Sequence, residues 1–219
     1  EPTACAVHGA LVRAGTSGPT AVVIGAGTLG LCTVAALSRY RPDIETVIAI
    51  AKHPEQRRLA SALGATVVAE PAELRRAVRR RTGSLVLDSG QLTGGADIVF
   101  DCVGSASSLT DALAVVEPGG AIVLLGMPGE VRVDLTGLWQ REIQLVGAYA
   151  YGTEHRPGAK KSVRTFDLAF ELVGEAGLER LVSATYPLDR YREAIEHAAN
   201  AGRRGAVKVA FDLRKEKRR

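Results

Sequence analysis

The sequence predicts an α/β protein whose core is a Rossmann-type, doubly wound parallel sheet of six strands. Three observations lead to this fold class. Short apolar runs, rich in β-branched residues and without polar alternation, recur along the 219-residue chain, which is typical of strands buried on both faces. Segments with a helical pattern separate these runs. A glycine-rich turn follows the first of the strong strand patterns.

The first half of the chain alternates between helix and strand. A short helix is expected over Thr3–Val12, and the segment AGTSGP ends it. Pro54 suits the first turn of a later helix, which Gly64 ends. The expected strands are Thr20–Ile24, Thr46–Ile50 and Thr66–Val68, and the expected helices are Thr28–Tyr40, Pro54–Leu63 and Ala72–Arg81.

The second half resumes this alternation after a long loop, Thr82–Gly95, which contains at most a small strand at Leu85–Leu87. A strand within ADIVFDCVG ends near Asp101, and Trp139 is expected near a short helix. The remaining expected strands are Ala121–Leu125, Ile143–Gly147, Leu181–Tyr186 and Ala206–Asp212, and the expected helices are Ser105–Val116, Val163–Val173 and Leu188–Asn200.

Composition favours a folded cytoplasmic protein. Apolar residues make up 46% of the chain, which argues against global disorder. The formal net charge of +4 comes entirely from the final RKEKRR, so it gives no argument for nucleic-acid binding. The uncharged stretch Ala21–Ser38 is interrupted by glycines and fits a strand, turn and helix better than a membrane span. Cys5, Cys32 and Cys102 suggest no disulfide framework, and no signal peptide is visible.

The segment VVIGAGTLGL places Gly25, Gly27 and Gly30 in a GxGxxG pattern between a predicted strand and a predicted helix. Gly25 permits a tight turn, Gly27 lets a pyrophosphate approach the backbone, and Gly30 lets the helix lie close to the strand. The N–H groups of the first helical turn, which contains Thr28 and Leu29, then face the phosphates.

Two alternatives to a dinucleotide site remain open at this turn. In the first alternative, the turn is purely structural and binds no ligand. Three glycines at this spacing argue against it, because they weaken the start of a helix unless a ligand needs the space. A methyltransferase is the second. That class usually has a GxGxG turn and an acid at the tip of the second strand, whereas this sequence has Leu29 at the third glycine and no acid at that tip.

The tip of the second strand indicates which cofactor is preferred. In NAD-binding proteins an acidic residue roughly 20 positions after the turn holds the ribose 2′-hydroxyl. Ala51 occupies this place, 21 residues after Gly30, and we expect no carboxylate at the tip. Lys52 and Arg57 supply cations that match a 2′-phosphate. The sequence therefore predicts NADP as cofactor, with NAD as the alternative if these cations are merely solvated.

Beyond these patterns, the chain resembles the zinc-type medium-chain dehydrogenases, which include alcohol, polyol and threonine dehydrogenases. The resemblance rests on EPTACAVHGA, VVIGAGTLG, LGA, TGGADIVFDCVG, EPGGAIVLLG and the final YREAIEHAANAGRRGAVKVAFD. It implies that Cys102, Val103 and Gly104 line the ribose side of the cofactor. It also implies that Leu125 and Gly126 lie near the nicotinamide, and that Glu1 lies at or beside a catalytic zinc.

The same resemblance implies an organisation into parts. Residues 1–19 would be a hinge helix and linker, 20–175 the NAD(P)-binding domain, 176–212 a segment returning toward a catalytic domain, and 213–219 a basic tail. The family's GroES-like catalytic domain, which supplies the zinc ligands, is expected to be missing from this chain. His8 is interpreted as a helix-surface or interdomain residue, since one Glu and one His are too few for zinc.

The functional expectation is therefore the cofactor-binding part of a zinc-dependent alcohol or polyol dehydrogenase. This chain would hold the nicotinamide cofactor without turning over alcohol, and no catalytic residue is assigned within it. We expect a small alcohol or polyol as the substrate of the complete enzyme, a homodimer or homotetramer, and no nucleic-acid or membrane partner. A non-catalytic nucleotide-binding module and a zinc-independent, quinone-reductase-like member are the alternatives.

Overall fold

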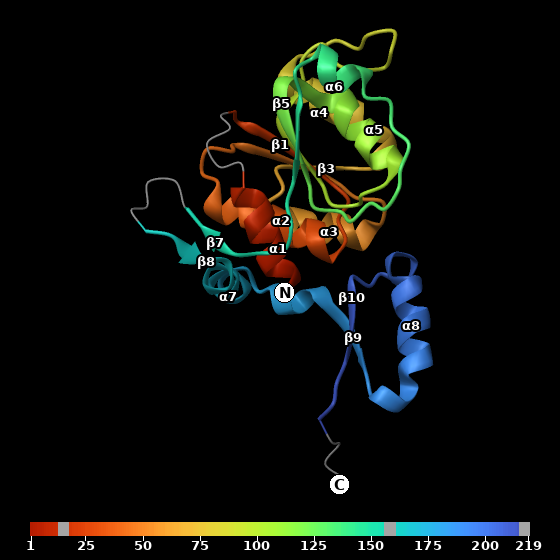
Figure 1. The fold of residues 1–219 in the computed structure, drawn as a ribbon. Coiled ribbons are helices and arrows are strands. Elements are labelled where there is room, and N and C mark those ends of the chain that lie inside the picture. The colour runs from red at the N-terminus through yellow and green to blue at the C-terminus, as the bar shows by residue number, and fades with distance from the viewer. Residues whose placement is uncertain (13–17, 156–160, 215–219) are drawn as a thin grey trace.

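A six-stranded parallel sheet forms the centre of the computed structural model, which describes residues 1–12, 18–155 and 161–214 (Figure 1). The strands lie in the order β3-β2-β1-β4-β5-β6, and each neighbouring pair is parallel. Their bounds are β1 Thr20–Ile24, β2 Thr46–Ile50, β3 Val67–Ala69, β4 Ala96–Asp101, β5 Val116–Leu124 and β6 Gln144–Gly147. This arrangement confirms the predicted Rossmann-type fold, with its change of direction between β1 and β4.

Helices cover both faces of this sheet (Figure 1). One face carries α1 (Pro2–Leu11), α2 (Thr28–Tyr40), α3 (Pro54–Ala62) and α7 (Thr165–Ala176). The other carries α4 (Leu74–Thr82), α5 (Ala106–Val115) and α6 (Thr136–Gln140). Side chains of β1 alternate between the two cores, with Val23 in the first and Val22 in the second. Burial on both faces explains why the strands are continuously apolar in sequence.

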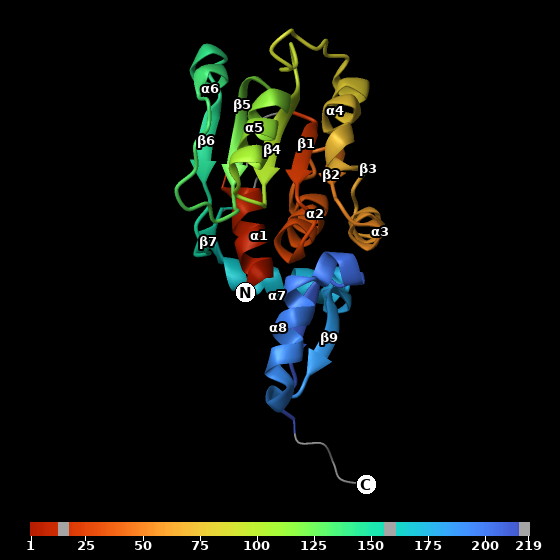
Figure 2. The same ribbon diagram turned by 90° about the vertical axis from the view of Figure 1, so that its right-hand side faces the viewer.

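Two smaller sheets follow the main one along the chain. The first is an antiparallel pair of β7 (Thr153–Glu154) and β8 (Val163–Arg164). The second pairs β9 (Val182–Tyr186) with β10 (Lys208–Phe211) in parallel, and α8 (Tyr191–Ala199) packs against it. Figure 2 shows this last unit extending away from the main sheet. Short 3₁₀ helices span Pro71–Glu73, Leu178–Leu181, Leu188–Arg190 and Ala201–Arg204.

Several expected boundaries were wrong. β5 begins at Val116 rather than Ala121, because Val116 already pairs with Ala96 before a register shift, and α5 consequently ends at Val115. The helix expected from Val163 begins only at Thr165, because Val163 pairs with Glu154 across the chain. Both errors have one cause: pairing with a strand distant in sequence overrides the local pattern.

Other predicted segments are only partly described or differ in detail. The small strand expected at Leu85–Leu87 is a single bridge between Val86 and Leu92. Most of the AGTSGP segment and of the 213–219 tail lies outside the described residues. Within the parts of the chain that the structure describes, no helix is both long and apolar enough to cross a bilayer.

Candidate functional site

The glycine turn between β1 and α2 has a different geometry at each glycine. Gly25 has a φ of 90°, which favours glycine, and its N–H donates to the Ile50 carbonyl at 3.0 Å. A Cβ at Gly30 would lie 1.8 Å from the carbonyl oxygen of Gly25, so only glycine lets α2 approach the turn. A Cβ at Gly27, in contrast, would meet no atom within 4 Å. The turn therefore leaves open space in front of Gly27.

The amino end of α2 faces this open space without a side-chain cap. Gly27 is the N-cap residue, and the N–H of Leu31 is bonded to its carbonyl at 2.9 Å. The N–H groups of Thr28 and Leu29, earlier in the same turn, have no intrahelical acceptor. Uncapped N–H groups and the positive end of a helix dipole attract an anion. This part of the chain is suited to a phosphate.

The tip of β4 is organised by a fully buried carboxylate. Asp101 Oδ1 accepts hydrogen bonds from the N–H groups of Val103 at 2.9 Å and Gly104 at 3.0 Å. Its Oδ2 accepts from the Ser108 hydroxyl at 2.9 Å. Asp101 thus shapes the loop that holds Cys102, Val103 and Gly104 instead of facing a ligand. The Cys102 thiol is unsuited to act as a nucleophile, because burial raises its pKa to about 12.

The tips of β4 and β5 touch through two glycines. A Cβ on Gly126 would lie 2.3 Å from the nitrogen of Gly104, and a Cβ on Gly104 would lie 2.8 Å from the carbonyl carbon of Gly126. Leu125, just before Gly126, is buried against α1, where a Cβ at Gly9 would meet it at 2.4 Å. The predicted ribose and nicotinamide segments therefore form one continuous edge beside the turn at Gly27.

A cavity of about 510 Å³ continues from this edge. It brings together predicted residues just before α1, in the first turn of α2 and just after β5. It also adds residues that the sequence analysis did not single out, such as Met127 and Ala148. Tyr149 and Tyr151, which follow β6, both line it. The complete lining is Glu1, Pro2, Cys5, Thr28, Leu29, Leu125, Met127, Ala148, Tyr149, Ala150 and Tyr151.

The predicted metal position lies at the rim of this cavity. Glu1 is exposed, and its Oε1 accepts a hydrogen bond from Cys5 Sγ at 3.1 Å. Burial and this contact raise the pKa of the Cys5 thiol to about 11, so it is not a thiolate ready to bind a metal. Among the described residues no group of three or more His, Cys, Asp or Glu side chains could hold a metal ion. The described residues alone therefore do not fit a zinc site.

At the tip of β2 the structure corrects the expectation that no carboxylate is present. Ala51 is buried there, and its N–H donates to Ala69 at 2.9 Å, which brings the end of β3 alongside. Glu70 follows β3 and forms an ion pair with Arg57, with Nη2 and Oε1 3.1 Å apart. The sequence argument missed this acid because it considered only residues close to β2 in the chain. Lys52 is exposed, and none of the described residues forms an ion pair with it.

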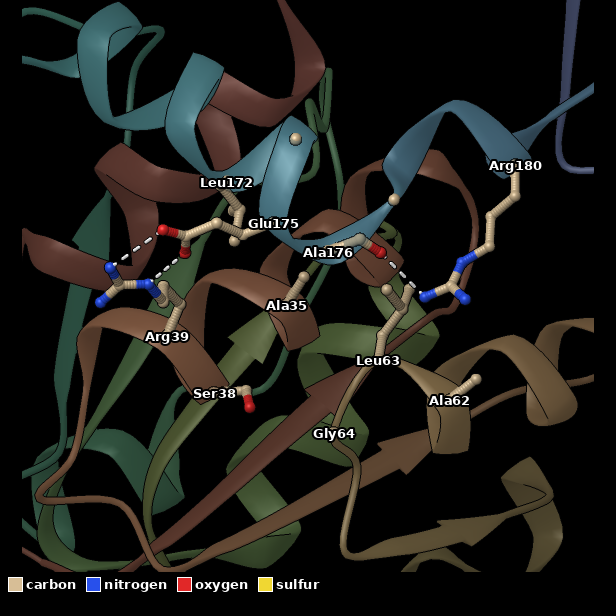
Figure 3. A pocket seen from close by; sticks show the side chains of 12 residues that line it. Ala35, Ser38, Arg39, Ala62, Leu63, Gly64, Leu172, Glu175, Ala176 and Arg180 are labelled. Carbon is tan, nitrogen blue, oxygen red and sulfur yellow. Dashed lines mark hydrogen bonds and ion pairs between the residues drawn. The ribbon is translucent and has the colours of Figure 1, made fainter.

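A second hollow, of about 700 Å³, lies beyond the carboxyl ends of α2, α3 and α7 (Figure 3). Its charged groups are already engaged: Arg39 pairs with Glu175, and Arg180 donates to the Ala176 carbonyl at 2.9 Å. None of the predicted cofactor residues lines it. Despite its greater volume, this hollow carries no chemistry comparable to the edge at Gly27.

The chain matches the family model described as "Zinc-binding dehydrogenase" over residues 28–163. It is 30% identical over 217 residues to a Rhizobium meliloti (strain 1021) protein described as a D-xylulose reductase, covering 97% of this chain and 56% of that protein. It is also 27% identical to sorbitol dehydrogenase from Arabidopsis thaliana, covering 97% and 55% respectively. The chain thus spans about half the length of the curated relatives it matches.

Among solved structures, one similar protein is from Sinorhizobium meliloti 1021, described as a zinc-binding dehydrogenase and bound to NADP. The two chains are 27% identical and superpose with a TM-score of 0.70, covering 97% of this chain and 58% of the other. The similarity extends beyond the glycine turn to nearly the whole of this chain.

Proposed function

This chain belongs to the zinc-binding dehydrogenase family, and we propose that it binds and orients a nicotinamide cofactor for an alcohol or polyol dehydrogenase. One observation carries the proposal: α2 starts without a side-chain cap at the point where Gly27 leaves open space. A structural turn would need neither feature. The names of the relatives, which include a xylulose reductase and a sorbitol dehydrogenase, support the substrate class.

In this proposal the cofactor lies along the carboxyl edge of the sheet. The pyrophosphate binds at the turn from Gly25 to Gly30, and the adenosine ribose lies at the tip of β2. The nicotinamide passes the edge formed by residues 102–104 and 125–126 and enters the 510 Å³ cavity. The chain's own contribution is to hold the cofactor and to exclude water from the cavity, with Leu29 and Leu125 as apolar walls.

We propose NADP as the preferred cofactor. Lys52 is free to meet a 2′-phosphate, and Arg57 is held close by, because its Nη1 donates to the carbonyls of Ala51 at 3.2 Å and Lys52 at 3.1 Å. Ala51 itself places no negative charge at the strand tip. The NADP bound to the Sinorhizobium meliloti relative supports this choice.

The reaction proposed for the complete protein is hydride transfer between an alcohol carbon and the nicotinamide. Zinc would serve as a Lewis acid on the alcohol oxygen when bound. Since the described residues do not form a zinc site, Glu1 can take part only with ligands from outside them. This chain by itself should therefore bind cofactor without oxidising alcohols. A non-catalytic nucleotide-binding role remains the second candidate, favoured by the same lack of a metal-binding group among the described residues.

Assembly and location are proposals of the same kind. The outer strand β6 is largely exposed, with Leu145 45% accessible, and we propose that it joins copies of the protein into a homodimer or homotetramer.

Cys5, Cys32 and Cys102 are all free, which supports the proposed cytoplasmic location.

Titration of the chain with NADPH and with NADH tests the cofactor proposal, with calorimetry as the readout. We expect a lower Kd for NADPH. Failure to bind either nucleotide would reject the proposed function, whereas equal or tighter NADH binding would reject only the NADP preference. Oxidation of an alcohol by this chain alone, dependent on added zinc, would contradict the assignment of a purely cofactor-holding role.

A further inference from the structure

The ion pair between Arg57 and Glu70 lies where a cofactor's ribose substituent is proposed to bind. Arg57 comes from the first turns of α3, and Glu70 from the residue after β3. Their side chains are 26% and 56% exposed, so the pair faces solvent on one side. Exposed pairs of this kind add little to stability. The pair is therefore of interest for its position at the proposed ribose site and not for its contribution to the stability of the fold.

Both partners are held in place from the backbone side. The guanidinium of Arg57 is fixed over the tip of β2, because its Nη1 donates to the carbonyls of Ala51 and Lys52. The backbone of Glu70 is held by the 3₁₀ turn that follows it, where the N–H of Glu73 donates to the Glu70 carbonyl at 2.9 Å. A ligand group that approaches this guanidinium therefore meets the Glu70 carboxylate beside it.

We propose that Glu70 is a specificity-determining residue that weakens the binding of a 2′-phosphate and so limits the preference for NADP over NAD. This inference rests on the proposed function. A 2′-phosphate that reaches Arg57 must share the guanidinium with a carboxylate and is repelled by it. A 2′-hydroxyl carries no charge and can donate a hydrogen bond to Glu70. Glu70, which follows the neighbouring strand β3, thus supplies the acid that the tip of β2 lacks. Its negative charge counteracts the attraction of Lys52 and Arg57 for a phosphate.

The test compares the Kd of NADPH and of NADH for the unchanged chain, Glu70→Gln and Glu73→Gln. Glu73 is the matched control: it lies in the same turn and its loss changes the net charge equally, but it pairs with Arg76. We expect Glu70→Gln to tighten NADPH binding roughly two- to fivefold, the range for an exposed charge pair, and not to tighten NADH binding. The gain should shrink at high salt, where exposed charges are screened.

Two results would overturn this inference while leaving the proposed function intact. One is a change in the NADPH-to-NADH ratio no larger in Glu70→Gln than in Glu73→Gln. The other is an undiminished effect of Glu70→Gln in an Arg57→Ala background, since the proposal assigns part of the effect to competition for Arg57. If the unchanged chain binds neither nucleotide, the proposed function fails and this inference fails with it.

Discussion

His8 and Glu154 are separated by 146 residues in the sequence, yet Nδ1 of His8 lies 2.8 Å from Oε1 of Glu154. The contact ties α1 to the β7–β8 pair. Glu154 is almost completely buried, and the hydroxyl of Thr165 donates to the same oxygen at 2.6 Å. His8 is thus a partly buried hydrogen-bonding residue between two elements of the chain. His8 was interpreted as a helix-surface or interdomain residue, and no pattern in the sequence indicated this contact with Glu154.

Replacing His8 with Ala should lower the free energy of unfolding by about 1–3 kcal/mol, because it leaves the buried Glu154 with one hydrogen-bond donor fewer. Urea-induced unfolding measures the change. His155→Ala is the matched control, since His155 is exposed and adjacent to Glu154. Equal stability of the two variants would show that the contact with Glu154 contributes nothing.

Ala substitutions at Gly27 and Gly30 should separate binding from folding. Gly27→Ala places its methyl group in open space, so its melting temperature should stay unchanged while NADPH binding weakens about tenfold or more, because the phosphates lose backbone hydrogen bonds. Gly30→Ala should instead destabilise the fold by roughly 1–3 kcal/mol through overpacking against Gly25.

Thermal unfolding and nucleotide titration of both variants check this pair of outcomes. Gly174→Ala is the control, since a Cβ there also meets open space but lies in α7, away from the turn. If Gly27→Ala still bound NADPH tightly, the phosphates could not lie against the backbone at Gly27.

Arg141 should contribute more to the stability of the fold than a partly exposed side chain usually does. Its guanidinium donates to the carbonyls of Leu113, Leu92, Gly94 and Val116 at 2.7–3.1 Å, and partial burial lowers its pKa. These bonds anchor the 82–95 loop to the sheet. We expect Arg141→Lys to cost roughly 1–3 kcal/mol in urea unfolding, because one ammonium cannot reach all four carbonyls. A cost near zero would mean that the loop is held by other contacts.

The Cys5 thiol should react slowly with iodoacetamide at pH 8. Burial and the contact with Glu1 raise its pKa to about 11, so little thiolate forms, and alkylation should be roughly an order of magnitude slower than for an ordinary thiol. The rate should keep rising with pH beyond 9 instead of levelling off. Mass spectrometry of the Cys5 peptide gives the rate.

The contact with Glu1 can be tested separately in the same assay. Glu1→Gln removes one cause of the raised pKa of Cys5, so alkylation at pH 8 should be faster. Glu130→Gln, an exposed acid elsewhere, provides the same change in charge and should leave the rate unaltered. Identical rates for both variants would assign the raised pKa to burial alone.

Most of the main sheet could be predicted because its information is local. The strands Thr20–Ile24 and Thr46–Ile50 and the helix Thr28–Tyr40 were predicted with their observed bounds. Apolar runs and helical spacing are properties of neighbouring residues, and they hold wherever the element lies in the fold. The position of the glycine turn was also predictable, since its three glycines lie between a clear strand pattern and a clear helix pattern.

The missed features depend on residues that are distant in sequence. The β7–β8 pair, the early start of β5 and the contacts of Arg141 form only when separate segments meet. No local pattern marks Glu70 as a partner of Arg57. Its position follows from the pairing of β3 with β2, which brings Ala69 beside Ala51.

The sequence by itself determined the fold class, the place of the glycine turn and the absence of an acid within β2's own tip, because short-range pattern and residue chemistry fix these. Only the tertiary structure decided which charges surround that tip and which residues enclose the cavity beside it. Parallel strands bring their carboxyl ends to one edge of the sheet, and there residues such as Arg57 and Glu70 become neighbours.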